Sequence, residues 1–126
     1  MRILLDTHIV LWVLAGSKRI DAIKDVILSD DTEVYISAAS WWELAIKIGL
    51  KKFEGNLPEL RSAAADSGFI ELPVKGEHTE ALIALPPYHN DPFDRLLLAQ
   101  ATTEPLRLIT ADKKLEQYSE LVWKIP

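Results

Sequence analysis

The chain has 126 residues, of which 48% are hydrophobic and 26% are charged, and its formal net charge is −5. This length suits a hydrophobic core without disulfides, so we expect residues 1–126 to form one domain. The absence of cysteine excludes a thiolate metal site, a cysteine nucleophile and a disulfide scaffold, and suits a cytoplasmic protein. No apolar run approaches the ~20 residues of a membrane helix, so we expect no membrane partner.

The acidic balance at first argues against a nucleic-acid partner, because domains that bind nucleic acid usually carry a basic surface. The sign of the charge is misleading if carboxylates gather in one metal site. Two divalent cations bound there would change the net charge from −5 to about −1, and the acids would no longer repel phosphate.

Short apolar segments alternate with helical patterns along the chain. Residues 2–5 have the character of a buried parallel strand, and a helix over 7–15 should follow and end at Gly16. Strands alternating with helices predict a parallel sheet covered on both faces, an α/β/α sandwich. The other expected elements are helices at 17–28, from 40, 58–65, 76–84, from 92 and 112–118, and strands at 33–38, 69–72, 106–110 and 121–125.

The segment H-N-D-P-F-D-R-L-L-L-A, residues 89–99, predicts the start of a helix. Asp91 is a preferred N-cap residue, and Pro92 suits the first helical position because its missing N–H costs nothing there. Taken alone, Asp94 complements the helix dipole and Arg95 forms a surface ion pair.

Acidic residues follow the strands at positions that the topology should bring together. Asp6 ends the first strand, Glu43 lies in the first turn of the helix after the second, and Asp112 comes two residues after the fourth. Right-handed crossovers place such residues at one edge of a parallel sheet, where ligands of α/β proteins bind. Asp94 joins them if the N-terminus of its helix points to that edge. Clustered carboxylates without thiolate or a histidine pair suit Mg²⁺ or Mn²⁺.

Each acid also has a purely structural explanation. Glu43 completes a capping box with Ser40, and it is four residues before Lys47, the spacing of a helical ion pair. Asp6 and Asp112 suit N-caps. These explanations account for the residue types but not for the shared edge.

Four sequence patches together resemble the PIN domain, and more closely the VapC-type toxins of toxin–antitoxin pairs. They are L-L-D-T-H (4–8), S-W-W-E-L-A (40–45), D-P-F-D-R-L-L-L-A-Q-A (91–101) and L-I-T-A-D (108–112). The resemblance implies a five-stranded sheet in the order 3-2-1-4-5 and a Mg²⁺- or Mn²⁺-dependent endoribonuclease with one or two ions. It also implies an RNA substrate, a cognate antitoxin protein and a homodimer.

The resemblance carries the catalytic, metal-binding acids over onto Asp6, Glu43, Asp94 and Asp112. We expect Asp6 and Asp94 to be the main ligands, Glu43 a ligand or a water-orienting base, and Asp112 a ligand of a weaker second position. Three further residues are possible supporting groups. Thr110 matches a hydroxyl residue beside such sites, Asp91 is an extra acid with a capping or helper role, and Arg95, like Lys47, either contacts substrate phosphate or forms a surface ion pair.

Histidine and tryptophan residues allow other interpretations. His8 and His89 suggest zinc binding with Asp6, but no H-E-x-x-H or comparable pair supports it. Trp41 fits the core stripe of its helix. Trp42 is about 100° away from Trp41 around the helix, so with Ile46 it forms a second apolar face, covered either by a loop or by a partner.

Two other function classes remain open at this point. An aspartate at the end of the first strand also suits a phosphatase, but the Asp-x-Asp of the haloacid-dehalogenase type is missing, because His8 occupies the second place. A non-catalytic PIN-fold interaction module is the other alternative. Its mark would be a lost acid, and none is lost.

Overall fold

Five parallel strands form one sheet in the order β3-β2-β1-β4-β5 in the computed structural model, which describes all residues from 1 to 126. The predicted strand order is therefore confirmed. In the central register, Leu4 lies between Tyr35 and Leu108. The strands are β1 (Arg2–Leu5), β2 (Glu33–Ser37), β3 (Ile70–Leu72), β4 (Arg107–Thr110) and β5 (Val122–Lys124).

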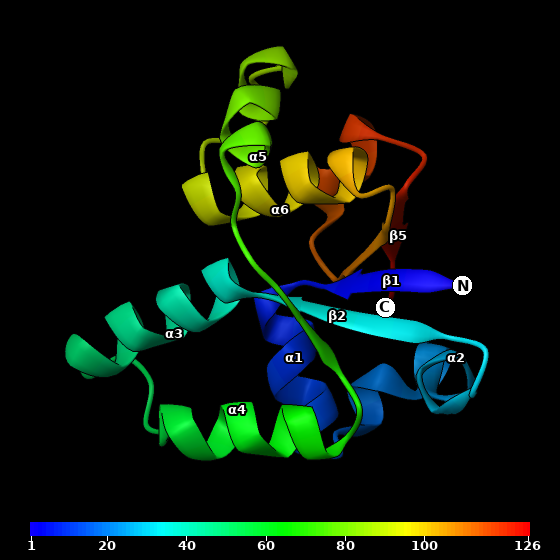
Figure 1. Cartoon of the computed structure of the whole chain (residues 1–126), viewed down its shortest axis with the longest axis vertical. Coiled ribbons are helices and arrows are strands. Elements are labelled where there is room, and N and C mark those ends of the chain that lie inside the picture. Colours follow the sequence, from blue (N-terminus) through cyan, green and yellow to red (C-terminus); the bar gives the residue numbers. More distant parts are fainter.

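Helical segments connect the strands and cover both faces of the sheet. They are α1 (Thr7–Leu14), η1 (Lys18–Ile23), α2 (Lys24–Leu28), α3 (Ala38–Gly49), α4 (Leu57–Asp66), α5 (Gly76–Ala81), η2 (Leu82–Ala84), α6 (Pro92–Thr103) and η3 (Lys113–Tyr118). Figure 1 shows α5 and α6 on one side of the strands and α1, α2 and α4 on the other. The α/β/α layering expected from the sequence is confirmed. None of the helices combines the length and apolar character that crossing a membrane requires.

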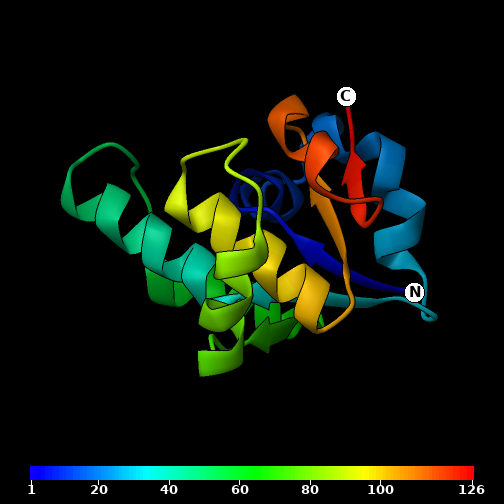
Figure 2. The same ribbon diagram turned by 90° about the horizontal axis from the view of Figure 1, so that it is seen from above.

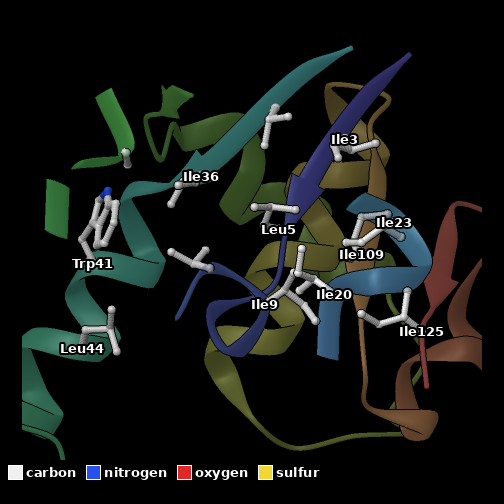
Figure 3. Close-up of a cluster of buried hydrophobic side chains, with 13 residues drawn as sticks. Ile3, Leu5, Ile9, Ile20, Ile23, Ile36, Trp41, Leu44, Ile109 and Ile125 are labelled. Atoms are coloured by element: carbon white, nitrogen blue, oxygen red, sulfur yellow. The ribbon is translucent and has the colours of Figure 1, made fainter. Parts of the chain in front are cut away.

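The hydrophobic core lies in two layers, one on each face of the sheet. Ile3, Leu5 and Ile109 belong to the layer beneath α1 and α4, which Figure 3 shows in close-up. Leu4 and Leu108 point the other way and pack with residues of α6. Strands buried on both faces need apolar residues at every position, which explains the unbroken I-L-L of β1.

The third helix begins earlier than the sequence indicated. Ser37 is its N-cap, with the side-chain oxygen accepting from the Ala39 N–H over 3.0 Å, so the predicted capping box of Ser40 and Glu43 is wrong. β2 pairs with β3 as far as Ser37, and the helix follows without a connecting loop. Ser40 is instead buried, and its Oγ accepts a hydrogen bond from the Thr7 hydroxyl over 3.0 Å.

Three predicted helices contain 3₁₀ turns, and in the predicted helix 76–84 the last three residues form the 3₁₀ helix η2. The segment after Ser17 is the 3₁₀ helix η1 before it becomes α2, and the segment after Asp112 is the 3₁₀ helix η3. All three are short, as 3₁₀ helices usually are. The remaining elements differ from prediction by one or two residues at their ends.

Candidate metal-binding site

A cleft of about 370 Å³ opens at the carboxyl edge of the sheet. All four acids expected at this edge line it, together with Asp91. Asp94 lies at this edge because the N-terminal end of its helix, α6, points there and lies beside α3 (Figure 2). The lining residues are Asp6, His8, Trp12, Glu43, Lys47, His89, Asp91, Asp94, Ala111 and Asp112.

Asp6 is buried at the end of β1 with both carboxylate oxygens hydrogen-bonded. Oδ1 accepts from the backbone N–H of Thr7 over 2.7 Å, and Oδ2 accepts from the hydroxyl of Thr110 over 2.7 Å. Burial raises the pKa of Asp6, and these hydrogen bonds oppose the increase. Asp6 thus caps α1 as the structural explanation foresaw, and still presents free lone pairs to the cleft.

Asp94 lies in the first turn of α6, where Asp91 fixes the start of the helix. Oδ1 of Asp91 accepts from the N–H groups of Phe93 and Asp94 over 2.9 and 3.0 Å, so the predicted cap is confirmed. Burial, followed by the charge of Asp6, raises the pKa of Asp94 to about 7. The raised pKa means that no nearby positive charge outweighs the effects of burial and of the neighbouring negative charge on Asp94.

Glu43 lies in the second turn of α3 and is 9% exposed. Its Oε2 is 3.1 Å from Nζ of Lys47, which confirms the expected helical ion pair. The charge of Glu43 contributes to raising the pKa of Asp6, so the two carboxylates influence one another across the cleft.

Asp112 is the most accessible of the four expected ligands, with 37% of its side chain exposed. Its Oδ1 accepts from the N–H of Lys114 over 2.9 Å and caps η3. Its backbone N–H donates to Oγ1 of Thr110 over 3.0 Å. Thr110 therefore links Asp6 to Asp112, as expected of a hydroxyl residue beside the site.

His89 lines the cleft, although the sequence suggested only a zinc-binding role for it and lacked a comparable partner to support that role. Its Nε2 is 2.7 Å from Oδ2 of Asp94 and 4.0 Å from Oδ2 of Asp112. One ligand atom from each of these three residues lies within 4.8 Å of the others. The sequence did place His89 two residues before the N-cap Asp91, and this closeness to the start of the helix could have indicated that His89 lies near Asp94. His8 also lines the cleft, but it is exposed and makes no hydrogen bond to a carboxylate.

Arg95 has neither of the roles expected for it. Its guanidinium donates to the carbonyl of Pro86 over 2.9 Å and to those of Leu82, Leu85 and His89 over 3.4 Å, and it does not line the cleft. No carboxylate pairs with it. The half-buried Arg95 therefore organises the segment that leads into α6, because a planar guanidinium with five N–H donors can bind several carbonyls at once.

The PIN domain model matches residues 3–121. The chain belongs to the PIN-domain family. It is similar to Ribonuclease VapC22 of Mycobacterium tuberculosis, with 26% identity over 118 residues, 92% of this chain and 91% of that protein. Its structure resembles that of VapBC2 from Rickettsia felis bound to a promoter DNA fragment, with a TM-score of 0.74, 16% identity and full coverage of both chains. A toxin–antitoxin complex from Klebsiella pneumoniae matches with a TM-score of 0.66 and 24% identity over 98% of this chain and 99% of that one.

The cleft of this PIN domain has the donor chemistry of a hard-cation site. Five carboxylates line it, and the ammonium of Lys47 is the only lysine or arginine charge among the lining residues. Carboxylate oxygens are the ligands that Mg²⁺ and Mn²⁺ prefer. The raised pKa values of Asp6 and Asp94 identify two carboxyl groups whose charge a cation would stabilise. The residues present therefore fit a divalent cation.

Proposed function

We propose that this protein is a divalent-metal-dependent endoribonuclease and the toxin component of a toxin–antitoxin pair. The observation that carries the proposal is the convergence of five carboxylates on one cleft with a single ammonium group. A relative that matches 92% of this chain is named a ribonuclease. Two structural neighbours are VapBC or toxin–antitoxin complexes. RNA is the proposed substrate, and the cytoplasm is the proposed location.

In this proposal Asp6 and Asp94 are the main ligands of Mg²⁺ or Mn²⁺, with one or two ions bound. When bound, the cation lowers the pKa of an attacking water and stabilises the leaving oxyanion of the phosphodiester. Glu43 binds the cation or orients the water, and Asp112 serves the weaker second position. The hydrogen bond from Thr110 favours the ionised form of Asp6, opposing the effect of burial, and orients its carboxylate. Lys47, half-exposed at the cleft wall, offers a positive charge to substrate phosphate.

The proposed protein partners have a candidate surface on α3. Trp42 is 59% exposed, Ile46 39% and Leu50 60%, so no loop covers this apolar face. The ring of Trp42 packs edge-on against Phe93, with 5.0 Å between centroids, next to the start of α6. We propose that a second copy of this chain or an antitoxin protein binds this face, because exposed apolar surfaces of this kind mark interaction sites.

The experiment that tests the enzymatic proposal is cleavage of a fluorescently labelled structured RNA, with Mg²⁺, with Mn²⁺ and with a chelator. We expect cleavage by the wild type only with metal, and its loss in Asp6→Asn combined with Asp94→Asn. Asp66→Asn, an exposed acid on α4 outside the cleft, is the matched control and should cleave normally. Metal-dependent cleavage retained by the double variant contradicts the proposal, and turnover of p-nitrophenyl phosphate without RNA cleavage favours the phosphatase alternative.

A further inference from the structure

We propose that the imidazole of His89 is a nitrogen ligand of the bound cation, and that the site consequently prefers Mn²⁺ over Mg²⁺. The proposal relies on the proposed function only for the presence of a cation. It adds a neutral nitrogen donor to a ligand set that the sequence indicated to be all carboxylate.

The spacing of three donor atoms supports this role. Two ligand atoms that each lie about 2.1 Å from the same cation are at most about 4.2 Å apart. Nε2 of His89 is 2.7 Å from Oδ2 of Asp94 and 4.0 Å from Oδ2 of Asp112. Nε2 of His89 and Oδ2 of Asp94 are thus close enough for one cation to contact both atoms, and Oδ2 of Asp112 lies at the outer limit of the same span.

The surrounding structure holds His89 in this position. Nη1 of Arg95 and the hydroxyl of Tyr118 each donate to the backbone carbonyl of His89 over 3.4 Å. Arg95 also binds the carbonyl of Pro86, three residues earlier. The imidazole is 15% exposed and faces the cleft, so little ordering remains to be done when a cation binds.

The second ring nitrogen is compatible with metal binding. No protein group accepts a hydrogen bond from Nδ1 of His89, so solvent can do so. When Nδ1 carries the proton of the neutral imidazole, Nε2 presents its lone pair to the cleft. The 2.7 Å contact between Nε2 of His89 and Oδ2 of Asp94 would then give way to a shared cation, with the proton of the neutral ring on Nδ1.

A second cluster with similar composition lacks these properties. Glu77, His78 and Glu104 also bring ligand atoms within 4.8 Å of one another. His78, however, is fully buried, with Nδ1 accepting from the N–H of Lys75 over 2.9 Å and Nε2 bonded to Glu104 over 2.5 Å. Both nitrogens have protein partners, so His78 is a structural residue, whereas His89 opens onto the acidic cleft.

The metal preference follows from the ligand type. Mn²⁺ shares the oxygen-ligand chemistry of Mg²⁺ but, as a first-row transition metal, accepts an imidazole nitrogen more readily, whereas Mg²⁺ prefers an all-oxygen environment. We therefore expect wild-type protein to bind Mn²⁺ at least tenfold more tightly than Mg²⁺. His89→Gln should weaken Mn²⁺ binding about tenfold, within the range known for disturbed metal sites, and should change Mg²⁺ binding less than threefold.

The decisive measurement is pulsed electron paramagnetic resonance of Mn²⁺ added alone to the purified protein. Wild type should show modulation from a directly bound ¹⁴N nucleus. His89→Gln should lose the modulation while still binding Mn²⁺ through its carboxylates, and circular dichroism should show an unchanged fold. His8→Gln is the matched control, because it removes the other histidine of the cleft, and it should keep the modulation.

The outcomes separate this proposal from the enzymatic one. Bound Mn²⁺ without ¹⁴N modulation in the wild type, or modulation that persists in His89→Gln, overturns the role of His89 and leaves the ribonuclease proposal intact. Failure of the wild type to bind any Mn²⁺ overturns the role of His89, and failure to bind Mg²⁺ as well overturns the metal-dependent ribonuclease proposal.

Discussion

The hydroxyl of Thr110 donates a hydrogen bond to Oδ2 of Asp6 over 2.7 Å, joining the ends of β4 and β1. The same Oγ1 accepts from the backbone N–H of Asp112, so one side chain orients two of the expected metal ligands. β1 and β4 are neighbours at the centre of the sheet although 104 residues of sequence separate the two side chains. The candidate metal site is therefore attached to the central strands of the sheet.

Replacing this hydroxyl should weaken the site. In Thr110→Val the pKa of Asp6 should rise further, because burial raises it and the hydrogen bond from Thr110 opposes that increase. We expect metal affinity and cleavage rate to fall about 10–100-fold, measured by calorimetry and single-turnover kinetics. Thr110→Ser keeps the hydroxyl and should stay near wild type. Equal losses in both variants would contradict a role for the hydrogen bond.

The raised pKa of Asp94, about 7 against an ordinary value of 3.8, makes the stability of the metal-free protein depend on pH. The folded state holds the Asp94 proton more tightly than the unfolded state, so stability should fall as pH rises from about 4 to about 7. Asp94→Asn should therefore be more stable than wild type at pH 8 in chelator by about 1–2 kcal/mol, after allowance for partial exposure, with little difference at pH 4. Urea unfolding at both pH values measures this, and added Mn²⁺ should reverse the order by stabilising only the wild type. A metal-free variant no more stable than wild type at pH 8 would show that Asp94 is not destabilised by its surroundings.

Asp91 can be tested as a cap rather than a ligand. Asn caps helices as well as Asp does, so Asp91→Asn should keep full stability and bind metal within about threefold of wild type. Asp91→Ala leaves the N–H groups of Phe93 and Asp94 without their acceptor and should lose about 1 kcal/mol in urea unfolding. A tenfold loss of metal affinity in Asp91→Asn would instead assign Asp91 to the ligand set.

Arg95 should act through the loop before α6. Arg95→Met keeps the aliphatic stem but removes every hydrogen bond to the carbonyls of residues 82–89. We expect faster amide hydrogen exchange over residues 82–90 and a stability loss of about 1–3 kcal/mol, with exchange in β1 and β4 unchanged. Arg95→Lys should recover only part of the protection, since an ammonium cannot span the same carbonyls. Unchanged exchange in the Met variant would contradict this organising role.

The exposed face of α3 should matter for association and little for folding. Trp42→Glu combined with Ile46→Glu adds charge to an exposed face and removes the edge-on contact of Trp42 with Phe93, so stability should fall by only about 0.5–1.5 kcal/mol. We expect light scattering to report monomers where the wild type forms dimers, or the loss of binding to a co-expressed antitoxin. Ala45→Glu, an exposed position on the same helix, is the control. Wild-type association by the double variant would exclude this face.

The sequence by itself determined the features that depend on local chemistry or on general topology. Asp91 followed by Pro92 starts a helix through neighbouring backbone groups alone, and Asp6 follows directly on a buried strand. Right-handed parallel connections then bring the strand ends together whatever the loops do. For the same reason the shared edge of Asp6, Glu43 and Asp112 was predictable, whereas the strand order came from the resemblance to the PIN domain and the place of Asp94 depended on the direction of its helix.

Only the tertiary structure decided which side chains turn towards that edge from irregular segments. His89 reaches Asp94 because Arg95 and Tyr118 bind its backbone, and Tyr118 is 29 residues away in sequence. Ser37, rather than Ser40, caps α3 because pairing with β3 extends β2 to that residue. From its sequence position Arg95 could pair with a carboxylate, a phosphate or carbonyl groups. Because residues 82–89 pack around it, it binds backbone carbonyls. Such orientations depend on contacts between residues distant in the chain, which no local pattern of residue types encodes.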